Sequence, residues 1–355
     1  MITILSFIFV IGVLVFFHEM GHFLAAKSVG VKVEKFYLGF NFFGLGLKKI
    51  YKGTEYGIGL FPLGGYVKLA GIIDESMDTE SNGDPNEFKS KNMFQKIWIM
   101  SAGVIMNFLL AIIIFAHLTY HNGINDPDSR SIIGQVYPDY PAYNFGLQEN
   151  DEIISINNTE VTDWESMTYE IHSHPNEDIK IQWIRDEIVM NGTIKTSSAP
   201  QLLGDELIEQ GMIGIIPILI HRDASIIESF SIGMKQTFHF INLTYRSLLA
   251  LVKGNVSFKE MSGPIMIAKI AGETASAGLS ALLGLMAFIS INLGFINILP
   301  IPGLDGGHIF IAFLEGVMRK ELPLKVKMGI QQIGVFLLLI LFITIMINDV
   351  QRLIQ

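Results

Sequence analysis

The chain of 355 residues contains no cysteine, and only 17% of its residues are charged. Without thiols, no disulfide supports an exported part, and a transition metal would have to be held by His, Asp or Glu. The net charge of -9 offers no basic surface, so no nucleic-acid partner is expected. Half of the residues are hydrophobic and the mean hydropathy is +0.43, which indicates an integral membrane protein.

Basic residues are also missing from the first apolar run, 1–26, where no Lys or Arg precedes Lys27. Leu24-Ala25-Ala26 would pass as a signal-peptide cleavage site, but the basic region that precedes the apolar part of a signal peptide is absent. We therefore expect this run to stay in the protein as a first membrane span.

The second half of this run carries His18, Glu19 and His22, a His-Glu-x-x-His pattern. On a helix, residues four apart share one face, so the two imidazoles can hold a single Zn²⁺ ion. The Glu19 carboxylate lies beside them, where it can take a proton from a water activated by the metal. Three fixed letters also match by chance, but ionisable groups at hydrocarbon depth are functional by default.

Three further apolar runs, 97–119, 279–316 and 327–348, are long enough to span a bilayer. Asn107 is the strongly polar side chain of the second run, a position typical of an interhelical hydrogen bond. Short connections rich in Lys and Arg stay in the cytoplasm, which puts 27–96 there together with the connection before the fourth run. Both termini and the segment between the second and third spans then face outward.

The segments between the spans differ in character. Region 27–96 is rich in Lys and Gly and predicts short strands, which we interpret as a β-hairpin-like, membrane-re-entrant element beside the first helix. Residues 130–198 have a soluble composition with strand and helix patterns, which predicts one compact α+β domain, and 199–223 form an extension of it. Residues 224–254 predict an amphipathic helix that lies at the membrane interface or packs on the core rather than spanning the bilayer. The predicted fold class is thus an α-helical membrane protein with four transmembrane helices.

A hydrolytic zinc site needs a third protein ligand. Glu34 and Glu55 are poor candidates, because they lie in a Gly-rich, strand-like stretch. Asp305 and His308 fit better, since they follow an apolar run in a stretch whose Pro and Gly residues would break the helix. Both residue types ligate zinc, so the chemistry of the side chains does not rank one above the other.

The run from Asn297 to Gly306, Asn-Ile-Leu-Pro-Ile-Pro-Gly-Leu-Asp-Gly, resembles the Asn-x-x-Pro-x-Pro-x-Leu-Asp-Gly motif of the site-2 protease family of intramembrane zinc metalloproteases. With His-Glu-x-x-His in the first span, the chain is similar to bacterial members of the RseP type (regulator of sigma-E protease). The resemblance implies one Zn²⁺ ion with Asp305 as its third ligand, Glu19 as catalytic base, and Asn297 as a residue that assists catalysis or holds substrate.

Within region 27–96, Gly57-Ile58-Gly59 is similar to the Gly-x-Gly of the family's re-entrant β element. We expect an edge strand here that pairs with an extended substrate through main-chain hydrogen bonds. The residues of this predicted substrate-binding strand are Thr54, Glu55, Tyr56, Gly57, Ile58, Gly59 and Leu60.

The outward domain resembles a PDZ domain, with Asp151 and Ile156-Asn157 among the residues at the appropriate spacing. Asn150 and Asn158 replace glycines that are usual there, and one such domain is visible where several relatives carry two. The resemblance implies a bacterial cytoplasmic (inner) membrane enzyme. Its substrates would be single-span membrane proteins, such as anti-sigma factors and remnant signal peptides, first cut outside by a site-1 type protease.

Two other classes of protein remain open from the residues alone. A PDZ-bearing membrane scaffold would keep a coordinatively closed, structural metal and would not need Glu19. A metal transporter would also place His and Asp within the membrane, but it would need polar groups that continue across the spans.

Overall fold

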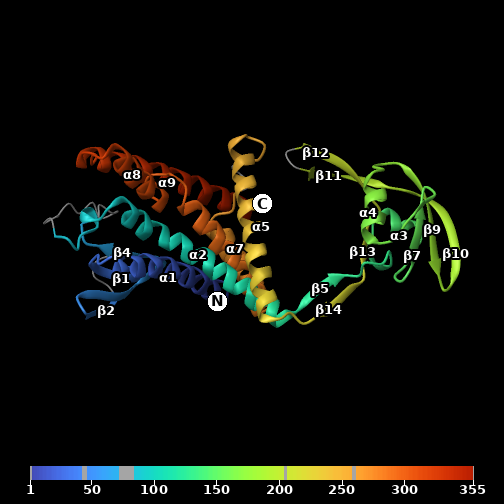
Figure 1. Ribbon diagram of the computed structural model, residues 1–355, viewed down its shortest axis with the longest axis horizontal. Helices are drawn as coiled ribbons and strands as arrows, with labels where there is room; N and C mark the ends of the chain where they lie inside the picture. Colours follow the sequence, from blue (N-terminus) through green and yellow to red (C-terminus); the bar gives the residue numbers. More distant parts are fainter. Residues whose placement is uncertain (1, 42–45, 72–83, 204–205, 258–260, 355) are drawn as a thin grey trace. The chain divides into compact units, whose positions relative to one another are not determined.

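The computed structural model of the protein describes residues 2–41, 46–71, 84–203, 206–257 and 261–354 (Figure 1). Parts of the predicted regions 27–96 and 199–223 thus lie outside the described residues. The chain forms two compact units. The helical unit comprises Met1–His121 and Ser225–Gln355, and the inserted unit comprises Asn122–Ala224.

Helices dominate the helical unit, and their bounds follow the apolar runs. They are α1 (Ile2–Ser28), α2 (Met93–Asn122), α5 (Ile226–Val252), α6 (Pro264–Ala277), α7 (Leu279–Asn297), α8 (Asp305–Met318) and α9 (Leu324–Ile354). Among the described residues, α1, α2, α7 and α9 are long and apolar enough to cross a membrane, as predicted. The predicted third run, 279–316, is two helices, because the proline-containing stretch between α7 and α8 cannot continue a helix. Helix α6 was not predicted.

The core of the helical unit joins α1, α2 and α7. Its buried apolar side chains are Val10, Leu14, Leu110, Ala111, Ile114, Phe115, Leu282, Met286, Ala287 and Ile291. Helix α5 packs on this core: the Phe240 ring stacks on Phe115 at 5.5 Å and meets Phe288 edge-on at 5.6 Å. Of the two predicted placements of the amphipathic helix, the structure therefore shows packing on the core.

A four-stranded sheet follows α1 instead of the predicted hairpin-like element. Its strands are β1 (Val33–Phe40), β2 (Gly46–Tyr51), β3 (Thr54–Gly59) and β4 (Phe61–Leu69), in the order β2-β3-β1-β4. Strand β3 pairs in parallel with β1 and antiparallel with β2. The prediction of an edge strand at 54–60 is thus wrong, and among the described strands β2 and β4 form the edges. Local alternation predicts that strands exist, but their order depends on long-range pairing.

The inserted unit combines two helices with ten strands among its described residues. The helices are α3 (Pro141–Phe145) and α4 (Trp164–His172), and the strands are β5 (Ile124–Pro127), β6 (Ile133–Val136), β7 (Glu152–Ile156), β8 (Thr159–Glu160), β9 (Asp178–Arg185), β10 (Ile188–Lys195), β11 (Ser197–Leu203), β12 (Glu206–Met212), β13 (Ile215–Pro217) and β14 (Leu219–Arg222). Because β13 pairs with β6 and β14 with β5, the predicted extension 199–223 is part of the domain. Ile213 lies in the same core as Ile153 and Ile181.

Local polar contacts stabilise this unit. Asn150 and Asn158 have φ of 70° and 67°, so these asparagines occupy the left-handed conformation that glycine otherwise favours. The Asp151 carboxylate is buried and accepts two hydrogen bonds from Arg185, each 2.7 Å long. Asp163 caps α4 by accepting from the backbone N–H of Ser166 at 2.7 Å.

Candidate metal centre

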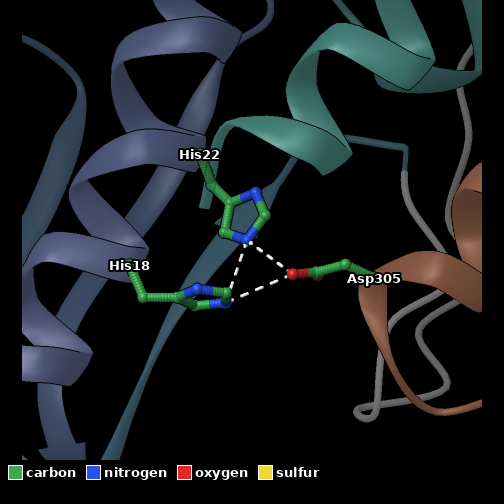
Figure 2. Close-up of side chains that lie close together, drawn as sticks. All are labelled: His18, His22 and Asp305. Carbon is green, nitrogen blue, oxygen red and sulfur yellow. Dashed lines mark hydrogen bonds and ion pairs between the residues drawn. The ribbon is translucent and has the colours of Figure 1, made fainter. Parts of the chain in front are cut away.

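Two imidazoles of α1 and one carboxylate of α8 converge at a single point (Figure 2). His18 and His22 are both buried and lie one turn apart on α1, with 3.3 Å between their Nε2 atoms. Oδ2 of Asp305, the first residue of α8, lies 3.2 Å from Nε2 of His18 and 3.4 Å from Nε2 of His22. Figure 2 shows the rings and the carboxylate pointing toward one another from opposite sides of the site.

The break between α7 and α8 brings Asp305 to the imidazoles. Gly303 adopts φ of 96°, a left-handed conformation that a larger side chain would strain. At Gly307, a Cβ atom would lie 2.5 Å from the carbonyl oxygen of Ile301, so the chain can turn back this tightly only without a side chain. The carboxylate then sits in the first turn of α8, where the helix dipole favours negative charge.

The distances between these three atoms fit a zinc ion. Zinc bonds to nitrogen and oxygen are about 2.0–2.1 Å long, so two ligands of a tetrahedral ion are separated by about 3.3–3.4 Å. The three measured separations range from 3.2 to 3.4 Å. Oδ2 of Asp305 is buried and has no hydrogen-bond donor among the described residues. Three potential ligand atoms that face one another in this way form a set suited to a divalent cation.

Neighbouring groups orient the two rings. Nδ1 of His22 lies 2.8 Å from the carbonyl oxygen of Ile99 on α2, to which it donates, and this leaves Nε2 with a lone pair for a metal. Nδ1 of His18 lies 3.2 Å from Nδ2 of Asn107, and Nε2 of His18 lies 3.3 Å from Nδ2 of Asn297 at the end of α7. Asn107 thus makes an interhelical contact, as predicted, and its partner on α1 is His18.

A cavity of about 740 Å³ opens onto these side chains. Glu19 and Asn297 line it, so the two residues predicted to act in catalysis share one space with His18, His22 and Asp305. His308 also lines the cavity, but it does not belong to the group of converging ligand atoms.

Glu34 and Glu55, the other two acidic residues considered as ligands, interact with residues of the sheet. Glu34 is paired with Lys68 at 3.7 Å. The Tyr37 hydroxyl donates to the Glu55 carboxylate at 2.5 Å, which lowers the pKa of Glu55, while burial and this bond raise the pKa of Tyr37 to about 12. Glu55 is therefore a carboxylate that stabilises the sheet, and neither residue belongs to the metal group.

Strand β4, not the predicted residues 54–60, lines the cavity. Gly65, Tyr66 and Val67 are among its lining residues, and none of the residues from 54 to 60 is. A Cβ atom at Gly65 would lie 2.7 Å from a methyl group of Val15, so β4 approaches α1 closely at the turn before Glu19. The Gly64-Gly65 pair within a strand pattern signals such an approach, and sequence reasoning missed it.

Gly103 of α2 was also missed. A Cβ atom there would overlap the His22 ring and lie 2.8 Å from Cε1 of His18, so only glycine lets both rings lie against α2. A small residue inside an apolar helix gives no local sign of this role, because helices approach each other at small residues in many membrane proteins.

Comparison with known proteins matches nearly all of the chain to one family. The model of peptidase family M50 matches residues 6–341. A Clostridium acetobutylicum protein described as a candidate zinc metalloprotease is 37% identical over 98% of this chain and 96% of its own length. Zinc metalloprotease RasP of Bacillus licheniformis is 28% identical over 99% of both chains. The match to the PDZ domain of an SdrC-like protein from Listeria monocytogenes covers 26% of this chain and 90% of that chain, at 22% identity and a TM-score of 0.21.

Proposed function

This chain belongs to peptidase family M50 and is a zinc metalloprotease of a bacterial membrane, and we propose that it is an endopeptidase that cleaves within the membrane. The observation that carries the proposal is the convergence of His18, His22 and Asp305 beside Glu19. Two of these ligands and the base lie on a helix long and apolar enough to span a bilayer, and the third directly follows the break after another such helix.

In this proposal, His18, His22 and Asp305 hold one Zn²⁺ ion, which, when bound, polarises a carbonyl group and makes water a stronger acid. Glu19 accepts a proton from the water that adds to the scissile carbonyl carbon. It then gives this proton to the leaving amine as the C–N bond breaks, so the carboxylate returns to its starting state. The Asn297 amide donates a hydrogen bond to the carbonyl oxygen as charge develops on it.

We propose that the substrate docks on β4. A peptide bond within a helix is protected by its own hydrogen bonds, so the substrate has to unwind before cleavage. The edge of β4 offers main-chain donors and acceptors to an extended segment of any sequence, and residues of this strand line the same cavity as Glu19. This assignment replaces residues 54–60, of which 54–59 form β3 inside the sheet.

The inserted unit, which we interpret as a PDZ domain, would lie on the outer side of the membrane together with both termini. The basic connection before α9 supports this orientation, because short basic loops stay in the cytoplasm.

The substrates would be single-span proteins, such as anti-sigma factors and remnant signal peptides, after a first cut by a site-1 type protease. If the inserted unit excludes uncut proteins, lengthening the exported part of a substrate slows cleavage; a rate independent of that length would contradict this filter.

The test of the proposed function uses the purified full-length protein in liposomes with a single-span peptide. We expect cleavage within the span, its loss when a chelator removes zinc, and its return when zinc is added. A scaffold with a structural zinc would bind the metal without cleaving, and a transporter would move metal across the liposome membrane without cleaving. Either outcome would contradict the proposal.

A further inference from the structure

Asn107 lies where α1, α2 and α7 meet. Its side chain is fully buried, and its backbone carbonyl accepts a hydrogen bond of 2.8 Å from the Ser290 hydroxyl on α7. Nδ2 of its amide lies 3.2 Å from Nδ1 of His18, while Oδ1 is buried without a hydrogen-bond donor among the described residues. A buried carbonyl oxygen without a donor is costly, so it calls for an explanation.

The requirements of a metal-binding imidazole bear on how this amide is oriented. If Nε2 presents its lone pair to a metal, the proton of the neutral ring is on Nδ1 and needs an acceptor. His22 has such an acceptor in the carbonyl oxygen of Ile99. At His18, the amide nitrogen of Asn107 faces Nδ1, so two hydrogen-bond donors would oppose each other. A half-turn of the amide exchanges Nδ2 and Oδ1, which places the carbonyl oxygen against the Nδ1 proton.

We propose that Asn107 is a positioning residue for His18. Its side-chain carbonyl accepts the Nδ1 proton and thereby holds the ring in the tautomer whose Nε2 lone pair faces the zinc ion. This inference rests on the ligands assigned under the proposed function. Ile99 and Asn107 lie about two turns apart on α2, so this helix orients both imidazoles without supplying a ligand.

The alternative is that Asn107 only joins helices. A structural amide stabilises the packing of α1 and α2, and its loss lowers stability without a specific effect on the metal. A positioning amide makes His18 a better ligand, and loss of such outer-shell partners typically weakens metal binding about 10- to 100-fold. Zinc affinity therefore separates the two roles.

The experiment measures the zinc dissociation constant of the full-length protein in detergent by competition with a chromophoric chelator, together with the visible absorption of the cobalt-loaded form. Asn107→Leu keeps the approximate size and removes the acceptor, and we expect about 10- to 100-fold weaker zinc binding with an altered cobalt spectrum. Asn107→Asp keeps an acceptor oxygen and should retain wild-type affinity. Asn107→Val tests the same loss of acceptor if leucine disturbs folding.

Ser290→Ala is the matched control, because it removes a buried hydrogen bond to the same residue without touching the His18 ring. It should lower thermal stability and leave zinc affinity unchanged. Wild-type zinc affinity in Asn107→Leu, or equal weakening in the leucine and aspartate variants, would overturn the positioning role. His18→Ala tests the ligand assignment separately: if that variant bound zinc as tightly as the wild type, the assignment would fail, and this inference with it.

Discussion

Oδ2 of Asp305 lies 3.2 Å from Nε2 of His18, although most of the chain separates the two residues. The proposed metal centre therefore forms only when α1 lies beside the break between α7 and α8. Helix α2 contacts both histidines through Ile99 and Asn107. Correct packing of the helical unit is thus a condition for the proposed metal binding.

Glu19→Gln should leave zinc bound and lower the rate of cleavage about 10²- to 10⁴-fold, which is the usual contribution of general acid–base catalysis. The amide has nearly the same shape as the carboxylate but cannot accept the proton of water. Zinc content by elemental analysis and cleavage of a single-span substrate are measured on the same preparation. Wild-type cleavage by this variant would refute the assignment of the base.

Asp305→Ala and His308→Ala should differ in zinc binding, although both residues line the cavity. Only Asp305 lies with the two imidazoles, so its removal should cost more affinity than the about 10- to 100-fold typical of outer-shell mutations. His308→Ala should keep zinc. Zinc titration of both proteins decides the matter, and the reverse ranking would show that His308 is the ligand.

Gly103→Ala should weaken zinc binding and cleavage, because the new methyl group would overlap the ring of His22. Gly12→Ala on α1 is the matched control, since a Cβ atom there meets nothing within 4 Å. The control should be neutral or more stable by up to about 1 kcal/mol, as expected for alanine in a helix. Equal zinc affinity in the two variants would contradict the proposed packing of the rings on α2.

Docking of substrate on β4 predicts a period of two along the substrate. In an antiparallel pair, successive residues alternate between positions that bond to the neighbouring strand and positions that do not. Methylation of single backbone nitrogens in a synthetic substrate should lower kcat/KM about two- to tenfold at alternate residues near the cleavage site, since each lost bond contributes about 0.5–1.5 kcal/mol. A uniform effect at every position would argue against strand addition.

The cap of α4 predicts acid sensitivity of the inserted unit. The hydrogen bond from the backbone N–H of Ser166 holds the pKa of Asp163 below its usual range. A carboxyl group with a lowered pKa stabilises the folded state above its unfolded pKa of about 3.9, and this contribution is lost as the pH falls through the folded value.

Asp163→Asn should keep the cap, because asparagine caps as well as aspartate does, but it should remove this part of the acid sensitivity. Fluorescence of Trp164 and Trp183, both in the inserted unit, follows unfolding at about pH 5 and below about pH 3.9. Asp163→Ala should lower stability at both values. An identical loss of stability in acid for the wild type and the asparagine variant would contradict this account of Asp163.

Local patterns in the sequence predicted the long helices of the chain. The lengths of the apolar runs indicated the four helices that can span a membrane, because the thickness of a bilayer sets that length. The i, i+4 spacing of His18 and His22 indicated a shared metal, because helix geometry alone brings such residues to one face. The proposed pair of histidine ligands therefore follows from local spacing, without any tertiary contact.

Tertiary structure decided the rest. Residue chemistry ranked Asp305 and His308 equally as zinc ligands, and the resemblance to the site-2 protease family implied Asp305. In the structure, the turn between α7 and α8 brings the Asp305 carboxylate, and not the His308 imidazole, to the two histidines. Strand order put β4, rather than residues 54–60, at the edge of the sheet and along the cavity. Hydrogen bonding along a helix is local, whereas strand pairing and contacts between helices join distant residues, so the pattern of neighbouring residues does not encode them.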